Sequence, residues 1–240
     1  MIEPDWPVPP GVRAVSTERT GGDSCGPYAS FNLAGHVGDD PGAVMANRGA
    51  LVRTLNLPSE PIWLEQVHGS DVLDLDIATP GRADGAVTST PERVCAVLTA
   101  DCVPVLLAAR DGRRVGVAHA GWRGLAAGVL AAAVECMGRP PAELQAWLGP
   151  AIGPTSYEVD ANVRDAFVGA DPGSDACFAP TRPGHWHADL YRLARLSLAR
   201  TGVTAVYGGD HCTLSEPERF FSHRREAPCG RMATLVWRTP

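Results

Sequence analysis

The stretch from Val94 to Gly124, VCAVLTADCVPVLLAARDGRRVGVAHAGWRG, sets the architecture expected of this chain. Its apolar runs, Val94–Thr99 and Val103–Ala109, are β-branched and aliphatic, which is typical of strands buried on both faces. Asp111-Gly112 is a favoured hairpin-turn pair, and small residues at Ala120-Gly121 precede an amphipathic run. The stretch therefore predicts strand, turn, strand, hairpin, strand and then helix.

Three potential metal ligands lie at the ends of these and neighbouring apolar runs. Cys102 follows Asp101 in the expected turn, His119 ends the third strand, and His68 ends the upstream run WLEQVHG. Two imidazoles and one thiolate form a plausible zinc site, and three protein ligands with an open fourth position are typical of catalytic zinc. The pattern predicts a metal site at one edge of the sheet, with Asp101 as a candidate acid–base group.

The same residues permit other interpretations. Cys102 and His119 are also the nucleophile and base that a Cys-His hydrolase requires, although this leaves His68 without a role. A copper site shares these ligands, but none of the four methionines is near them in the sequence. Taken singly, a thiol in a core and a histidine at a strand end are most often structural, and an aspartate in a turn often only caps the backbone.

Composition narrows the class of function. The 240 residues are 45% hydrophobic, which suits one domain over residues 1–240, and the net charge of −6 argues against nucleic-acid or anionic-membrane partners. Every Lys/Arg position is arginine, which excludes Schiff-base lysines and a P-loop lysine. A small-molecule substrate is therefore expected.

The seven cysteines are spread along the chain without a CxxC pair, which favours reduced thiols over a disulfide framework. The sequence shows neither a signal-peptide pattern nor an apolar run of membrane-spanning length. We therefore expect a cytoplasmic protein, with a monomer favoured.

Around the central stretch, strand and helix patterns are mixed without strict alternation. This favours an α+β or layered arrangement over a doubly wound sheet. Short strands are expected at Pro61–Val67, Asp71–Asp76, Ala86–Ser89, Leu144–Leu148, Val203–Tyr207 and Met232–Trp237. Helices are expected from Asp40-Pro41 to before Pro58, from Trp122 to Met137, from Ala161 to Val168 and from Asp189 to Arg200, with an irregular stretch up to His185 and a loop holding the pair His185 and His187.

Three arginines are candidate clamps for an anionic group. Arg48, Arg123 and Arg224 carry planar guanidinium groups that match phosphate or carboxylate in a bidentate way. A solvated surface arginine is the commoner case for any one of them. We predict that they bind substrate, with phosphate as the anion.

A set of sequence blocks resembles the laccase-domain (polyphenol oxidase) family. The most specific blocks are QVHG, TADC and HAGWRG, and the full series in chain order is RTGG, FNL, HVGDDP, NR, QVHG, ADGAVT, LTADCVPVLL, HAGWRG, LGPAIGPTSYEV, CT, ERFFS and RRE. The resemblance implies zinc ligands at His68, Cys102 and His119, and a layered α/β/β/α fold with mixed sheets. It also implies purine nucleoside phosphorylase activity on adenosine, inosine, guanosine and S-methyl-5′-thioadenosine, together with adenosine deaminase activity.

The resemblance leaves several alternatives open. The family name implies a copper-dependent polyphenol oxidase, some relatives are described as peptidoglycan-precursor editing hydrolases, and a non-catalytic metal-binding protein is a further choice. A true multicopper laccase needs repeated His-x-His pairs, whereas this chain has one. His223 stands where the family usually has tyrosine, which leaves the range of nucleosides open.

Overall fold

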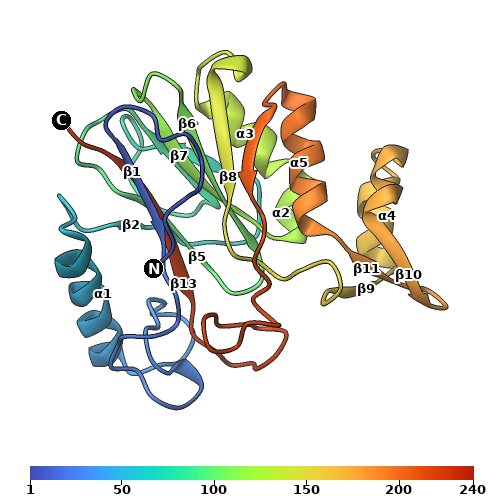
Figure 1. Ribbon diagram of the computed structural model, residues 1–240, viewed down its shortest axis with the longest axis horizontal. Coiled ribbons are helices and arrows are strands. Elements are labelled where there is room, and N and C mark those ends of the chain that lie inside the picture. Colours follow the sequence, from blue (N-terminus) through green and yellow to red (C-terminus); the bar gives the residue numbers. More distant parts are fainter.

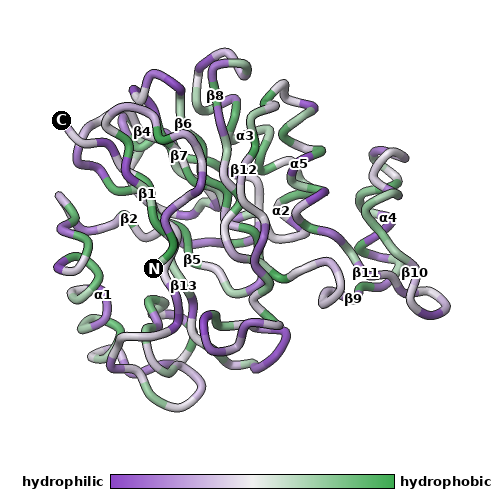
Figure 2. The backbone as a smooth tube through the Cα atoms, in the orientation of Figure 1, coloured by the Kyte–Doolittle hydropathy of each residue, from purple (hydrophilic) through white to green (hydrophobic).

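Two β-sheets lie face to face with helices on both outer sides in the computed structural model, which describes residues 1–240 (Figure 1). Hydrophobic residues gather between the sheets and beneath the helices, and hydrophilic residues occupy much of the outer loops (Figure 2). The arrangement is the layered α/β/β/α fold with mixed sheets that was predicted. None of the helices has the length and apolar character needed to cross a membrane.

The larger sheet has six strands in the order β12-β8-β6-β7-β4-β3. Two edge pairs, β12 with β8 and β3 with β4, are parallel, and the inner pairs are antiparallel. Every residue of β6 and β7 is buried, as predicted for strands covered on both faces. The bounds of the six strands are β3 Val72–Asp74, β4 Gly85–Thr88, β6 Val103–Ala109, β7 Val115–Ala120, β8 Leu144–Leu148 and β12 Ala205–Gly208.

The second sheet has four strands in the order β1-β13-β5-β2. It packs on the larger sheet through apolar side chains such as Val97 and Val236 from one side and Leu106 and Val117 from the other. The bounds are β1 Val12–Ser16, β2 Ile62–Trp63, β5 Cys95–Thr99 and β13 Met232–Arg238.

Helices complete the layers. α1 (Pro41–Leu55) covers the outer face of the four-stranded sheet, where Leu51 packs with Leu98 and Leu235. The six-stranded sheet is covered by α2 (Trp122–Ala127), α3 (Val129–Cys136) and α5 (Leu190–Thr201). A small lobe to their side combines α4 (Ala161–Val168) with the sheet of β9 (Glu158–Asp160), β10 (Phe178–Arg182) and β11 (His185–Ala188). Short 3₁₀ helices span Gly26–Tyr28, Pro141–Glu143 and Pro172–Cys177.

The single helix expected from Trp122 to Met137 is wrong. Gly128 interrupts it in the left-handed conformation (φ 90°), and its N–H caps α2 on the carbonyl groups of Gly124 and Leu125 before α3 begins. An alanine- and leucine-rich pattern hides such a break, because glycine inside a helical pattern is often tolerated.

Two other segments differ from expectation. His185 and His187 lie in β11 and not in a loop, since β11 pairs with β9 and, across the Gly184 turn, with β10. The strand expected over Pro61–Val67 shortens to β2, because Gln66 uses its side-chain amide in place of the backbone. The amide donates to the Leu98 carbonyl (2.8 Å) and accepts from the Leu98 N–H (2.7 Å).

Candidate metal centre

His68, Cys102 and His119 come together at one edge of the six-stranded sheet. One ligand atom from each lies within 4.8 Å of the others, and the two imidazole rings meet edge to face with centroids 4.7 Å apart. His119 is buried, Cys102 is half-buried and His68 is exposed. The group could therefore hold a metal ion on the side that faces solvent.

Strand register brings two of these ligands together. β6 pairs with β7 so that Val103 lies opposite Ala120 and Pro104 opposite His119, which places Cys102, just before β6, beside His119. The turn before Cys102 is as tight as expected, because Asp101 adopts a left-handed φ of 86°. His68 also has a positive φ, 60°, at the end of its own segment. Both are uncommon backbone states for residues with a Cβ atom, and such states often mark functional sites.

Asp84 is the anchor of this centre. Fully buried just before β4, it accepts hydrogen bonds from the N–H groups of Val67 (3.2 Å), His68 (2.9 Å) and Gly69 (2.6 Å). It also contacts Nδ1 of His119 at 2.8 Å. A carboxylate on Nδ1 fixes the imidazole orientation and leaves Nε2 for a metal, so one side chain orients two ligands.

Gly121 lets the backbone pass close to the ligands. A Cβ atom at this position would lie 2.8 Å from Cys102 Sγ and 3.3 Å from Cδ2 of His68. The small residue predicted at the end of β7 is therefore required by a close approach of backbone to the centre.

The electrostatics of the centre favour a thiolate. Burial acts to raise the pKa of the Cys102 thiol, but the positive charge of His119 and hydrogen bonds from both histidines lower it below the ordinary value. Burial likewise acts to lower the pKa of His119, which the Cys102 thiolate and Asp84 raise. A thiolate is the form that binds metal, so the centre is prepared for a soft or borderline cation.

A cavity of about 490 Å³ opens in front of these three residues. This volume falls in the range of small-molecule sites. Apart from the three ligands, its lining includes the aromatic residues Trp122 and Tyr157, the ionisable residues His36, Asp101, Arg123, His223, Arg224 and Arg231, and apolar residues of the surrounding strands and loops.

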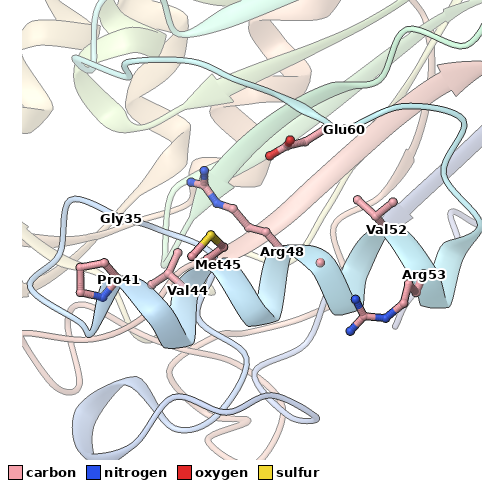
Figure 3. A pocket seen from close by; sticks show the side chains of 9 residues that line it. Gly35, Pro41, Val44, Met45, Arg48, Val52, Arg53 and Glu60 are labelled. Carbon is pink, nitrogen blue, oxygen red and sulfur yellow. The ribbon is translucent and has the colours of Figure 1, made fainter.

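Two of the three predicted arginine clamps reach this cavity. The guanidinium of Arg123 lies over the Trp122 ring at 4.6 Å and that of Arg224 over the Tyr157 ring at 5.0 Å. Arg48 is instead part of a groove along α1 (Figure 3). It stacks on Trp63 at 4.3 Å and donates from Nε to the carbonyl of Leu33 (3.0 Å).

Asp101 is the only carboxylate among the cavity-lining residues. Its two oxygens accept hydrogen bonds from the Thr213 hydroxyl (2.6 Å) and from the main-chain N–H of Arg224 (2.7 Å). These bonds tie the turn that carries Cys102 to the segment that carries His223 and Arg224.

Sequence reasoning missed Asp84, His36, Arg231 and the aromatic pair of the cavity. The only sign of Asp84 in the sequence is an aspartate between small residues at the start of a buried strand, a signal too common to select it. His36 and Arg231 lie 195 positions apart in the numbering, and only the fold brings both to the cavity lining.

Comparisons with known proteins agree with this architecture. A family model described as "Multi-copper polyphenol oxidoreductase laccase" matches residues 13–239. A purine nucleoside phosphorylase of Escherichia coli is 51% identical over 239 residues, covering 99% of this chain and 98% of the relative. One from Pseudomonas aeruginosa is 52% identical over 98% of this chain and 97% of its own length. The crystal structure of a Neisseria meningitidis protein superposes with a TM-score of 0.96 at 45% identity, covering 100% of this chain and 99% of the other.

Proposed function

The chain belongs to the multi-copper polyphenol oxidoreductase laccase family, and we propose that within it this protein acts as a metal-dependent purine nucleoside phosphorylase. Its substrates would be adenosine, inosine, guanosine and S-methyl-5′-thioadenosine, with adenosine deamination as a second activity. Two observations support the proposal: similarity to phosphorylases over nearly the whole chain, and a cavity that joins a His-Cys-His group to aromatic and cationic side chains.

The donor set fits zinc. Two histidines and one cysteine form a three-ligand set of the catalytic type, and Asp84 supplies the carboxylate that metal-bound histidines commonly contact. A mononuclear copper electron-transfer site would want a weak methionine ligand, but no methionine lines the cavity. When bound, zinc supplies a Lewis acid to the substrate.

Phosphorolysis sets clear demands on the cavity. An oxygen of phosphate forms a bond to C1′ of the ribose while the bond from C1′ to the purine nitrogen breaks, and the electron pair stays on the purine, which takes up a proton. The site must hold a flat base, an anion and a proton donor. Trp122 and Tyr157 offer aromatic faces for the base, and Arg123 and Arg224 lie beside them as our candidate substrate-binding arginines.

Asp101 is our candidate for proton transfer. It is the cavity's single carboxylate, it is adjacent to Cys102, and Thr213 and Arg224 fix its orientation. Arg48, outside the cavity, stays a prediction as a substrate-binding residue. Its contact with Leu33 connects it to the segment that carries His36.

The test is an activity panel on protein with measured metal content. Adenosine, inosine, guanosine and S-methyl-5′-thioadenosine are each incubated with and without inorganic phosphate, and release of free base, ribose phosphate and ammonia is followed. We expect phosphate-dependent base release and phosphate-independent ammonia release from adenosine. If the protein instead carries stoichiometric copper and oxidises phenols faster than it cleaves inosine, it is a polyphenol oxidase. Turnover of peptidoglycan precursors alone would favour an editing hydrolase.

A further inference from the structure

The cavity carries two cationic groups of residues that lie in different surroundings. Burial and the negative charge of Cys102 raise the pKa of Tyr157 to about 12, while the positive charges of Arg224 and Arg123 act against this rise. Burial lowers the pKa of His36, and the positive charges of Arg231, Arg48 and His68 lower it further. One group is therefore built around aromatic rings, and the other around an imidazole and a guanidinium.

Only one nitrogen of the Arg231 guanidinium, Nη1, donates hydrogen bonds to the protein. Its Nη1 donates to the carbonyl groups of Cys229 (2.7 Å) and Gly230 (3.0 Å), and its main-chain N–H donates to the side-chain oxygen of Asn32 (2.9 Å). Its Nε and Nη2 donate to no protein group, and no carboxylate forms an ion pair with it. A fixed guanidinium with free N–H groups at a cavity is suited to bind an oxyanion through two parallel hydrogen bonds.

His36 lies near Arg231 without a protein partner. The segment that carries it is fixed from both sides, because Leu33 accepts from Arg48 (3.0 Å) and donates to the Arg231 carbonyl (3.3 Å). The imidazole is only partly covered by the protein and makes no hydrogen bond to it. A second donor is thus available beside the guanidinium.

No carboxylate of the cavity forms an ion pair with Arg231 or His36. The only carboxylate of the cavity, Asp101, already accepts hydrogen bonds from Thr213 and Arg224 at both oxygens. The whole chain has a net charge of −6, so the cationic lining is a local feature and not a reflection of composition. A local excess of positive charge in a cavity attracts anions.

We propose that Arg231 and His36 form the phosphate subsite of the cavity, with inorganic phosphate as the ligand. The inference rests on the phosphorylase function proposed above. It assigns the two substrates to different sides of the cavity. Phosphate binds on the His36 and Arg231 side, and the purine binds against Trp122 and Tyr157. Arg123 and Arg224 then contact the nucleoside.

The kinetic test uses metal-loaded protein and separates the two substrates. Initial rates of inosine phosphorolysis are measured against phosphate at saturating inosine and against inosine at saturating phosphate, for Arg231→Gln, His36→Gln and the control Arg13→Gln. Arg13 is exposed on β1 and outside the cavity. We expect KM for phosphate to rise about tenfold to a hundredfold in R231Q and about twofold to tenfold in H36Q. KM for inosine should change less than about twofold.

Arg231→Gln could raise KM through a local loss of structure, because Arg231 donates hydrogen bonds to the Cys229 and Gly230 carbonyl groups. His36→Gln is free of this ambiguity, because the His36 side chain makes no hydrogen bond to the protein. The proposal is overturned if KM for phosphate is unchanged in H36Q and also in R231Q, provided that R231Q is folded. A parallel rise in both KM values in H36Q also overturns it, since the residue would then not distinguish phosphate from nucleoside.

A binding test separates this inference from the proposed function. The thermal midpoint of each metal-loaded protein is measured with increasing inorganic phosphate, against chloride at equal ionic strength. The unaltered protein and R13Q should be stabilised by phosphate specifically, and H36Q less so. If no nucleoside is cleaved but this pattern holds, the phosphorylase function fails and the anion subsite stands. If phosphate stabilises none of the proteins, or all of them equally, the subsite fails whatever the activity.

Discussion

Two carboxylates that each accept several hydrogen bonds lie beside opposite ends of strand β4 and do different things. At its start, Asp84 accepts hydrogen bonds from three consecutive main-chain N–H groups and contacts His119. Beside its other end, Asp76, which follows β3 in the chain, accepts from the hydroxyl of Thr88 (2.6 Å), from Ser89 N–H (2.7 Å) and from the hydroxyl of Thr90 (2.8 Å). The two carboxylates differ in what surrounds them.

The partners of Asp84 include two potential metal ligands, whereas those of Asp76 include none. Asp84 orients His68 and His119 toward the cavity in front of them, whereas Asp76 lies within reach of Arg93 (3.4 Å) and Arg114 (3.6 Å), which balance its charge. An anchored carboxylate is therefore not by itself a sign of function. It becomes one where the groups it orients retain a free ligand atom beside open space. Damage at the start of β4 should appear in metal binding and activity, and damage at its end in stability alone.

The largest effect is expected from Cys102→Ala. The thiolate is the strongest zinc donor of the three, so its loss should remove most bound metal and lower both activities about a thousandfold or more. The fold should persist, because β5 and β6 are buried through their own apolar side chains. Metal content by elemental analysis, circular dichroism and the activity panel give the readouts, with the exposed Cys25→Ala as the matched control. Full activity in metal-free C102A would contradict the assignment of a metal-dependent reaction.

Asp84→Asn should come next. The amide keeps the size of the side chain but removes the charged acceptor for His119 and places a donor where N–H groups now converge. Loss of such a carboxylate partner typically weakens metal affinity about tenfold to a hundredfold. Competition with a chromophoric chelator measures the affinity, and Asp76→Asn is the control from the other end of β4. Equal metal affinity in the two variants would show that the two ends do not differ as we argue.

Arg123→Ala and Arg224→Ala should have smaller and more selective effects. Each guanidinium stacks on an aromatic ring that we assign to the purine side of the cavity, so we expect KM for inosine to rise about threefold to thirtyfold. Phosphate KM should change less, and the control Arg13→Ala, exposed on β1 and outside the cavity, should leave KM for inosine unchanged. If phosphate KM rises instead in R123A and R224A, the sequence-based assignment of phosphate to these arginines is the better one.

The sequence was informative where a property is local. Apolar runs predicted the buried strands β5, β6 and β7, because a strand that is buried on both faces needs apolar side chains on both. Cys102 and His119 were identified because they lie where those runs end. The mixed pattern of strands and helices already favoured a layered arrangement, and the pattern of strand ends already suggested the three-ligand group. The family resemblance added the α/β/β/α order and strengthened the ligand assignment.

Properties that depend on distant contacts could not be predicted. The Asn32–Arg231 hydrogen bond, which connects the segments of His36 and Arg231, joins positions separated by 199 residues. Asp84 orients two ligands because the segments that carry Gly69 and His119 fold onto it. The local sequence ADGAVT contains no pattern that predicts these contacts. Gly128 shows the same limit at short range, since a pattern that tolerates glycine does not say whether the helix will break there.

The smallest effect is expected from Asp76→Asn, and it should depend on pH in a defined direction. Burial acts to raise the pKa of Asp76, but the hydrogen bonds from Thr88, Ser89 and Thr90 lower it well below the ordinary value of 3.8. A carboxylate whose pKa is lower in the folded than in the unfolded state stabilises the fold fully above the unfolded value. That contribution is lost as the pH falls from about 3.8 toward the folded pKa.

We therefore expect Asp76→Asn to lower the free energy of unfolding by about 1 kcal/mol at pH 7. The difference from the unaltered protein should shrink below pH 4, because there Asp76 of the unfolded chain gains a proton while the folded carboxylate stays ionised. Urea denaturation at pH 7, 5 and 3 gives the comparison, and taking differences at each pH cancels the release of metal in acid. Asp210→Asn is the control, since Asp210 is exposed and its side chain makes no hydrogen bond. A deficit that grows as the pH falls, or metal binding weakened as in D84N, would mean that this end of β4 does more than stabilise the fold.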